Sequence, residues 1–426
     1  MMSRLGNHRT MYGIVVALLA ALVVGSQLPA VSDWLSGTTA KEDVPVLDES
    51  GATASSVEAT VDACNGFAFD LFGRYSVDDG NILFSPYSIS TALSMTYEGA
   101  RGETAEEMEA VFGFLEDPSE RLPSVAGIYN TLNEEGREYA LHTVNALWIQ
   151  QGYPVLEDYV DAIIGYYGGD VNALDFVAEP DESRVTINEW VEERTNDRIK
   201  DLFPSGSIDA DVRLVLTNAI YFKGDWLYEF DEEATGEEEF HVTPSTSVTV
   251  DMMSLRDETF NYAETDELQL LELPYTGEDV SMLILLPKEG RMGDVEAQLS
   301  AERLCEWVDV MEGTAVNVYL PRFTFETKYF MMEDLAEMGM PTAFTDAADF
   351  SGMTGNRELF IDKVIHQAFI EVNEEGTEAA AATGVSMRLS AAMPGEVFRA
   401  DHPFIFLIRD MDTGVILFMG RMTDPS

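Results

Sequence analysis

The sequence has few of the residues that bind metals or cross-link small folds. Only two of its 426 residues are cysteine, Cys64 and Cys305, and it contains no C-x-x-C pair and no H-E-x-x-H motif. We expect both cysteines to be buried free thiols in helices, because a chain of this length can build a core without disulfides; a single bond between them has no support in the sequence. The histidines lack the close spacing of metal ligands; they are His8, His142, His241, His366 and His402. The sequence therefore predicts no metal site.

The motifs of several enzyme classes are also missing. No G-x-S-x-G sequence is present, which argues against an α/β-hydrolase nucleophile. No Gly-Lys pair is present, which excludes a Walker loop for nucleotide phosphates. Carboxylates are abundant, with 77 Asp and Glu residues, but nothing in their spacing selects one acid–base pair. The sequence therefore predicts a protein that is not an enzyme and that carries no cofactor.

Basic residues are scarce, with 25 Lys and Arg against 77 Asp and Glu, which gives a net charge of −52. Such a surface repels nucleic-acid phosphates and the anionic headgroups of a membrane surface. Heparin-like polyanions are disfavoured as partners for the same reason. The acidic residues are spread along the whole chain, which indicates a surface adapted to high salt, where screening limits self-repulsion. We therefore expect the source to be a halophilic microbe, such as an archaeon.

The apolar run at the N-terminus is too short for a membrane-spanning helix, which needs about 20 residues. This run, Tyr12–Val24, has 13 residues and follows the basic positions Arg4, His8 and Arg9. A basic flank before a short apolar run is typical of a secretory signal. We therefore expect an extracellular or cell-surface protein.

Three regions follow from this pattern. Residues 1–30 are expected to be a signal peptide, cleaved near Ser26 or Ala30, or else an uncleaved signal anchor. Residues 31–57 are small and polar with scattered acids, and we expect them to be a tether. No linker divides the rest of the chain, so residues 58–426 are expected to form one large domain.

One stretch, residues 374–390, combines charge with small apolar side chains. It begins Glu-Glu-Gly-Thr-Glu-Ala-Ala-Ala-Ala from Glu374. A run of alanines has high helix propensity. With the period of a strand, however, Thr377, Ala379, Ala381 and Thr383 share one face and are small enough to enter a packed interior. The stretch therefore fits both an exposed loop and a central strand.

The sequence from Phe369 to Ala382 closely resembles the proximal hinge of the serpins, a family of loop-inserting protease inhibitors. Near the C-terminus, Ala400–Phe406 resembles the distal signature of this family and Leu417–Arg421 its last strand. Three earlier stretches are also similar to serpin sequences: Asn81–Ser90, Gly99–Thr104 and Thr217–Trp226. The resemblance extends over residues 58–426.

The hydrophobic periodicity indicates an α+β protein. A helical period covers Val57–Tyr75. Alternating or continuous apolar residues predict strands, and Asp412-Thr413-Gly414 predicts a hairpin turn between two of them; the predicted strands include Leu141–Ile149, Arg213–Phe222 and Val280–Leu286. The resemblance implies the serpin fold, with a large central mixed β-sheet, further sheets, about eight or nine helices and an exposed reactive-centre loop.

The resemblance also implies two polar sites along the central sheet. The positions that match the shutter, a hydrogen-bonded cluster beneath the sheet, are Ser85, Ser88, Asn188 and His366. Trp226 and Arg322 match positions of the breach, where the loop enters the sheet, and we expect Arg322 to pair with Glu374. Ordinary alternatives are a helix cap for Ser85, a core filler for Trp226 and a satisfied core group for His366.

The hinge implies an inhibitory serpin, because non-inhibitory members commonly have bulky, charged or proline residues at the small positions of this segment. The predicted hinge residues are Glu374, Glu375, Gly376, Thr377, Glu378, Ala379, Ala380, Ala381 and Ala382. The implied partner is a serine protease, held as a covalent acyl complex by a monomeric inhibitor. A papain-like cysteine protease as target and a non-inhibitory, chaperone-like or binding role are the alternatives.

The scissile bond is placed by counting along the loop from Glu374, as the family does. This count gives Ser390–Ala391. A count one residue shorter gives Leu389–Ser390, and Arg388–Leu389 would suit a trypsin-like protease. We favour Ser390, and hence a serine protease of small-residue or broad specificity.

Overall fold

The computed structural model describes residues 45–377 and 395–426, which belong to one folded unit, Pro45–Ser426. The predicted signal segment lies outside the described residues. The tether was predicted to extend over residues 31–57, but the folded part of the chain begins before residue 57, so the predicted C-terminal end of the tether is wrong. Leu47 is buried and its backbone N–H donates to Asn130 Oδ1 at 2.9 Å. Helix α1 begins at Ala54, because Thr53 and Ser56 cap it reciprocally.

The described residues form ten α-helices, slightly more than predicted. The helices are α1 (Ala54–Tyr75), α2 (Pro86–Tyr97), α3 (Gly102–Phe112), α4 (Pro118–Leu132), α5 (Glu157–Ala162), α6 (Pro180–Arg194), α7 (Met292–Glu296), α8 (Ala301–Val308), α9 (Met332–Met338) and α10 (Ser351–Thr354). A π-helix, η2 (Ile163–Tyr167), continues α5, and two 3₁₀-helices are η3 (Glu232–Ala234) and η4 (Thr342–Phe344).

The strands form two sheets, which confirms the predicted α+β class. The strands are β1 (Ile82–Phe84), β2 (Tyr139–Gln150), β3 (Asp170–Leu174), β4 (Leu214–Asp225), β5 (Gly236–Thr243), β6 (Thr246–Glu264), β7 (Leu268–Pro274), β8 (Val280–Pro287), β9 (Glu312–Pro321), β10 (Phe323–Phe330), β11 (Lys363–Val372), β12 (Gly376–Thr377), β13 (Glu396–Arg399), β14 (Phe404–Asp410) and β15 (Ile416–Met422). The predicted hairpin turn joins β14 to β15, and Gly414 there has φ +77°, a left-handed conformation that suits glycine.

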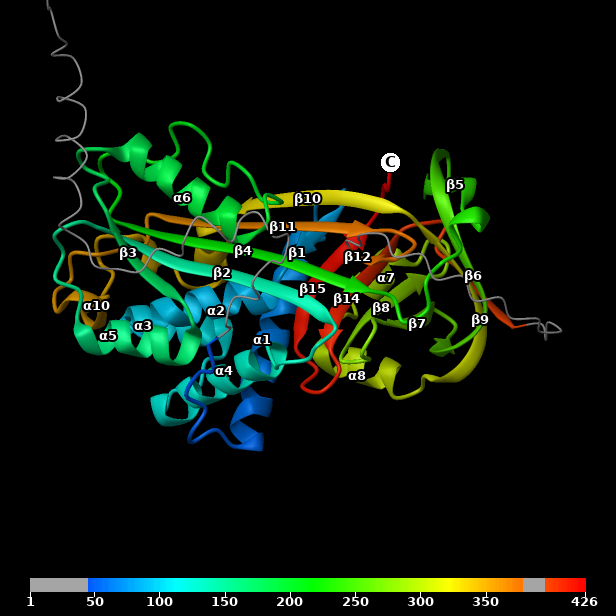
Figure 1. Cartoon of the computed structure of the whole chain (residues 1–426), viewed down its shortest axis with the longest axis horizontal. Coiled ribbons are helices and arrows are strands. Elements are labelled where there is room, and N and C mark those ends of the chain that lie inside the picture. Colours follow the sequence, from blue (N-terminus) through cyan, green and yellow to red (C-terminus); the bar gives the residue numbers. More distant parts are fainter. Residues whose placement is uncertain (1–44, 378–394) are drawn as a thin grey trace, which may run out of the picture. The chain divides into compact units, whose positions relative to one another are not determined.

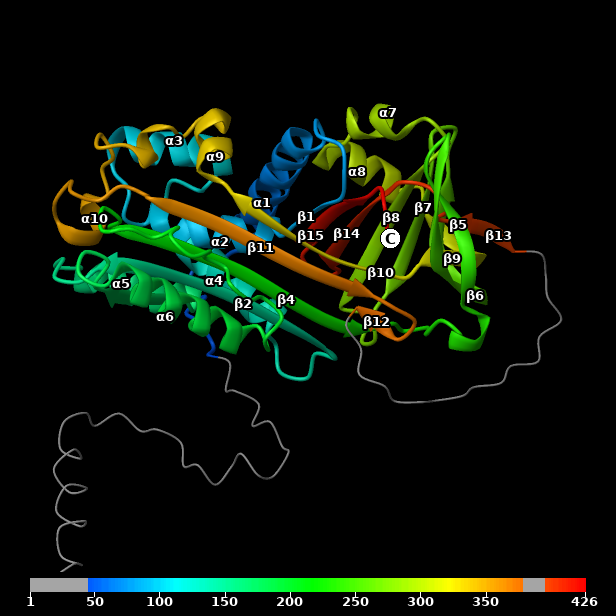
Figure 2. The ribbon, with the colours of Figure 1, turned by 90° about the horizontal axis from the view of Figure 1, so that it is seen from above.

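The six-stranded sheet is the central mixed sheet, with the order β10-β11-β12-β4-β2-β3. Its pairs β11–β4 and β2–β3 are parallel, and the other neighbours are antiparallel. The second sheet has nine strands and the order β1-β15-β14-β8-β7-β6-β9-β13, with β5 added beside β6. Figures 1 and 2 show the long strands β2, β4 and β11 lying side by side.

Helices cover the central sheet on both faces, with α6 on one side and α2 on the other (Figure 1). Successive residues of β4 alternate between the two faces. Val215 and Ala219 share a core with Ile187 of α6. Leu216 shares the opposite core with Leu93 of α2. Strand β4 therefore packs apolar side chains into a core on each of its faces, which is typical of a strand in a covered sheet.

Helix α2 is buried along its whole length, Pro86–Tyr97. Ser85 is its N-cap, because its Oγ accepts a hydrogen bond from the Ser88 N–H at 3.2 Å. Pro86 occupies the first helical position, where no N–H is required. The cap places the N-terminus of this helix directly beneath the central sheet.

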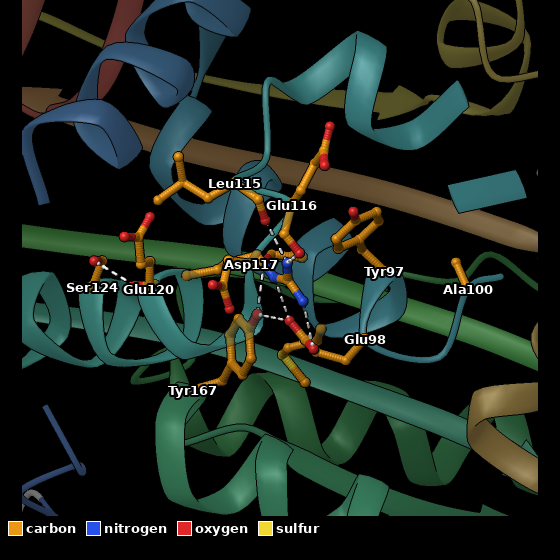
Figure 3. A network of polar contacts seen from close by, with 12 residues as sticks. Tyr97, Glu98, Ala100, Leu115, Glu116, Asp117, Glu120, Ser124 and Tyr167 are labelled. Carbon is orange, nitrogen blue, oxygen red and sulfur yellow. Dashed lines mark hydrogen bonds and ion pairs between the residues drawn. The ribbon is translucent and has the colours of Figure 1, made fainter. Parts of the chain in front are cut away.

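A buried ion pair joins the C-terminal end of α2 to the first turn of α4 (Figure 3). Arg121 Nε lies 2.8 Å from Glu98 Oε1, and the two side chains are 6% and 9% exposed. Tyr167 of η2 also donates to Glu98, at 2.8 Å. The Arg121 guanidinium lies over the Tyr97 ring, 4.7 Å from its centroid. Removing either charge would leave the other buried without its partner.

Both cysteines lie in helices, as predicted, and both are free. Cys64 is buried, and burial raises the pKa of its thiol to about 12. Cys305 is exposed, against the prediction, because Leu304 and Trp307 form the inward face of α8. Within the described residues, no helix is long and apolar enough to span a membrane.

Candidate functional site

The two central strands of the six-stranded sheet separate at one end. Strands β11 and β4 pair in parallel from Lys363–Val215 to Ala368–Ile220. Beyond this ladder, the short strand β12 lies between them. Thr377 pairs with Val372 of β11 on one side and with Gly224 of β4 on the other. The first part of the predicted hinge is therefore already a strand of the sheet.

The turn from β11 into β12 is held by hydrogen bonds to the side chain of its residue Asn373 and from Trp226. Asn373 Oδ1 accepts hydrogen bonds from the N–H groups of Glu375 and Gly376, both at 3.1 Å. The Trp226 indole donates to Asn373 O at 3.0 Å, and its backbone N–H donates to Glu375 O at 2.7 Å. Trp226 thus lies beneath the hinge and also fills the core, so the two predictions for this residue hold together.

Arg322 pairs with Glu374, as expected. Arg322 Nε and Nη2 donate to the two carboxylate oxygens of Glu374 at 3.1 and 2.5 Å. Thr235 Oγ1 donates to Glu374 Oε1 at 2.6 Å. Burial by itself would raise the pKa of Glu374, but these donors outweigh it and lower the pKa. The sequence did not indicate Thr235, which lies 139 positions away in the chain.

Three of the four predicted shutter residues meet beneath the middle of the sheet. The Ser85 N–H donates to His366 Nε2 at 3.0 Å, and Ser88 donates its N–H to Ser85 Oγ. All three residues are fully buried. Asn218 completes the cluster, since its amide donates to Ser88 Oγ at 2.5 Å and its Oδ1 accepts from His366 Nδ1.

Asn188 is not part of this cluster, which corrects the prediction. It lies on α6, on the opposite face of the sheet from α2. Its amide donates to Phe203 O at 2.9 Å and accepts from the Phe203 N–H at 2.8 Å. Asn188 therefore fastens α6 to the segment that follows it.

Asn218 and Asn145 are the two cluster members that sequence reasoning missed. His366, Asn218 and Asn145 occupy one rung across β11, β4 and β2. The Asn218 amide also donates to Asn145 Oδ1 at 2.6 Å. One signal was available: Asn218 shares the strand parity of Leu216 and Ile220, so it had to face the apolar core and find partners there.

His366 is a neutral imidazole in this cluster. Burial lowers the pKa of His366 to about 3. Its Nε2 accepts from Ser85, so in the neutral form Nδ1 carries the proton and donates to Asn218. All groups of the ring are satisfied without a charge. The cluster joins three strands to helix α2, and separating β4 from β11 requires the His366–Asn218 bond to break.

The remaining predicted positions, Glu378, Ala379, Ala380, Ala381, Ala382, Arg388, Leu389, Ser390 and Ala391, lie outside the described residues. Downstream, β13 pairs in parallel with β9, from Glu396–Val316 to Arg399–Tyr319. Within residues 45–377 and 395–426, no group of three or more His, Cys, Asp or Glu side chains has the geometry of a metal site.

Comparison with known proteins agrees with this architecture. Residues 62–425 match the family model for the serpins, described as serine protease inhibitors. An uncharacterized serpin-like protein of Methanosarcina acetivorans is 44% identical, over 90% of this chain and 93% of its own. The human leukocyte elastase inhibitor is 41% identical, over 84% of this chain and 97% of its own.

Solved structures give the same result. Uncleaved ovalbumin superposes with a TM-score of 0.77 at 32% identity, and covers 86% of this chain and all (100%) of its own. The fold defines a protein with a central mixed sheet whose two middle strands, β11 and β4, separate at one end, where the short strand β12 lies between them. The chain belongs to the serpin family.

Proposed function

We propose that this protein is an irreversible inhibitor of serine proteases that acts as a suicide substrate. The observation that carries the proposal is strand β12. Thr377 pairs with both β4 and β11, at the end where these strands part. A loop whose first residues already lie between the two central strands has a path for further insertion after cleavage.

The proposed mechanism uses the protease's own chemistry. The nucleophile of the protease attacks the carbonyl of the scissile bond in the reactive-centre loop, here called the bait, and forms an acyl-enzyme. Cleavage frees the bait to continue β12 as a full strand, which satisfies its backbone groups and buries apolar surface. The attached protease is carried along the sheet and distorted. Deacylation then stalls, because the oxyanion hole loses its preorganised geometry.

The composition of the hinge supports this mechanism over a non-inhibitory role. The positions that would follow Thr377 into the sheet interior are alanines or threonine at alternate places. Insertion of the hinge as far as Thr383 therefore buries no charge and no bulky side chain on the inward face. A non-inhibitory serpin with a binding or chaperone-like role is the alternative.

We further propose a target with small-residue or broad specificity, cleaved at Ser390–Ala391, with Leu389 and Arg388 as alternative bait residues. The human relative is named for leukocyte elastase, and an elastase-type protease has a small specificity pocket. Papain-like cysteine proteases are the alternative class of target, and we include them among the enzymes to be tested.

The test is incubation with elastase-, chymotrypsin-, subtilisin-, trypsin- and papain-like proteases at high salt. A denaturing gel then detects a covalent complex, and mass spectrometry of the released peptide identifies the cleaved bond. The proposal expects a stable complex with at least one serine protease. Complete cleavage of the bait by every enzyme without a complex would overturn it.

We also propose that the N-terminal segment directs the chain to the cell surface or exterior, where the inhibitor acts as a monomer. The net charge of −52 supports adaptation to high salt. N-terminal sequencing of the secreted protein tests the signal. A folded state that is unchanged at low salt would contradict the salt adaptation.

A further inference from the structure

The hinge residue Thr377 is held below the surface of the sheet. It is 2% exposed, although it stands at the last described position before the bait. Its hydroxyl lies 2.7 Å from the hydroxyl of Tyr275. This contact crosses from the central sheet to the segment between β7 and β8 of the second sheet, so it ties the hinge to a separate layer of the molecule.

The Tyr275 ring is fixed in place by the aromatic groups around it. It stacks on Trp226 with centroids 4.5 Å apart and an interplanar angle of 13°. Phe222 of β4 contacts its edge, at 5.1 Å and 74°. Tyr275 and Trp226 are also paired through their backbones in an isolated β-bridge. The position of the phenol is therefore set by contacts that do not involve Thr377.

The Tyr275 hydroxyl depends on the hinge for its hydrogen bond. Tyr275 is fully buried, and burial raises the pKa of its phenol far above the ordinary value. Within residues 45–377 and 395–426, Thr377 is the hydrogen-bond partner that the structure gives this hydroxyl. If Thr377 left the sheet, a buried hydroxyl would lose its partner, which is unfavourable.

The backbone of Gly376, next to Thr377, packs closely against strand β4. A Cβ atom built on Gly376 would lie 2.1 Å from Gly224 O and 2.7 Å from Asp225 Cα. Glycine therefore lets β12 approach β4 closely enough to pair. Two independent contacts therefore hold the hinge in the sheet: the hydrogen bond between the Thr377 and Tyr275 hydroxyls, and the close approach of the Gly376 backbone to Gly224.

We propose that Tyr275 is a positioning residue, whose hydroxyl holds Thr377 in the sheet before the bait is cleaved. The role of this hold in inhibition rests on the function proposed above. An anchored Thr377 gives the cleaved bait a strand that is already begun. Insertion then starts at once, and fewer acyl-enzymes hydrolyse before the protease is trapped.

Hydrogen exchange of the Gly376 and Thr377 amides in the uncleaved protein tests the hold directly. In Tyr275→Phe, which removes only the hydroxyl, we expect exchange at these two amides to rise about five-fold, the effect of one lost hydrogen bond. Thr377→Val should do the same. The double variant should exchange no faster than either single variant, because both partners of one bond are gone.

The matched control is Tyr159→Phe. Tyr159 is also buried, and its hydroxyl donates to Met95 O at 3.0 Å, in the helical region. This variant should leave exchange at Gly376 and Thr377 unchanged. The proposal is overturned if Tyr275→Phe leaves these amides unaffected, or if it accelerates the β11 ladder, Lys363–Ala368, to the same extent.

The activity readout is the amount of cleaved inhibitor formed per covalent complex. We expect Tyr275→Phe to raise this ratio by up to about five-fold with an unchanged bait sequence. If the wild type formed no complex with any protease, the proposed function would fail while the exchange result would still decide whether Tyr275 holds the hinge. An exchange effect without a change in this ratio would overturn the role in inhibition alone.

Discussion

The backbone N–H of Ser85 donates to the imidazole Nε2 of His366 across 3.0 Å, and so joins the N-cap of α2 to the central strand β11. This bond exists only while the ring is neutral, since a protonated imidazole has no acceptor. The acceptor position makes the shutter cluster sensitive to acid.

The first prediction concerns pH. The pKa of His366 is about 3 in the fold against 6.5 for an ordinary histidine. Between these values the unfolded chain binds a proton that the folded chain does not. The free energy of unfolding should therefore fall by about 1.4 kcal/mol per pH unit as the pH drops below 6.5, and be independent of this group above 6.5. Chemical denaturation at a series of pH values and constant high salt measures this free energy of unfolding.

The comparison variant is His366→Gln, which cannot titrate. Subtracting its pH profile from that of the wild type removes the contribution of the carboxylates. Two parallel profiles between pH 6.5 and 4.5 would contradict the assignment of a neutral buried His366.

The second prediction separates the two asparagines. Asn218→Ala leaves the His366 Nδ1 proton and Ser88 Oγ without their partner, and should lower the free energy of unfolding by about 1–3 kcal/mol. Asn188→Ala removes two bonds to Phe203 and should cost a similar amount. The midpoint of chemical denaturation gives both values.

The two variants should differ in pH dependence. Loss of Asn218 removes the acceptor of the His366 Nδ1 proton, so the pKa of His366 in the fold should change, and with it the pH at which the acid loss of stability levels off. Loss of Asn188, on the other face of the sheet, should leave this pH as in the wild type. A shift of this pH in Asn188→Ala would show that Asn188 belongs to the cluster.

The third prediction concerns insertion. Thr377→Arg should convert the inhibitor into a substrate, because a charge would have to stay in the sheet interior. The bait should be cut without a stable complex on a denaturing gel. Thr377→Ser, which keeps a small hydroxyl at this position, should still form the complex. A covalent complex retained by Thr377→Arg would refute insertion.

The fourth prediction is thermal. Cleavage of the bait should raise the melting temperature of the wild type, because the inserted strand adds backbone hydrogen bonds and buried surface to the sheet. The cleaved Thr377→Arg variant should show a smaller rise or none. Calorimetry of intact and cleaved samples measures the difference, and equal melting temperatures for the two wild-type samples would favour a non-inhibitory role.

The fifth prediction concerns the ion pair of α2 and α4. Arg121→Met leaves buried Glu98 without its cation and should cost about 3–5 kcal/mol. Adding Glu98→Gln should restore part of that loss. The control Arg194→Met breaks an exposed pair with Asp170 and should cost about 0–1 kcal/mol. Equal losses in Arg121→Met and Arg194→Met would show that burial does not matter here.

Local sequence was sufficient for much of the fold. The helix cap at Ser85, the turn before Val415 and the alternation within β4 are each decided by a few neighbouring residues. For this reason the strands, the first helix and the class were predictable. The ends of elements were less so, because Thr53 caps α1 through a contact that the apolar pattern does not reveal.

Partners distant in the chain were predictable only where the resemblance named them. It placed His366 beside Ser85 and Arg322 beside Glu374, and both pairs are present. It did not distinguish Asn188 from Asn218. Both are buried amides in apolar surroundings, and only the side of the sheet on which α6 packs separates them.

The sequence by itself determined the class, the small residues of the hinge and the strongly acidic composition, since these are properties of composition and local pattern. The tertiary structure decided which asparagine faces His366, that Cys305 is exposed, and that Thr377 lies under Tyr275 within the sheet. The physical reason is that each of these depends on which faces of separate elements meet. That choice is made by packing over the whole chain, and no short stretch of sequence contains it.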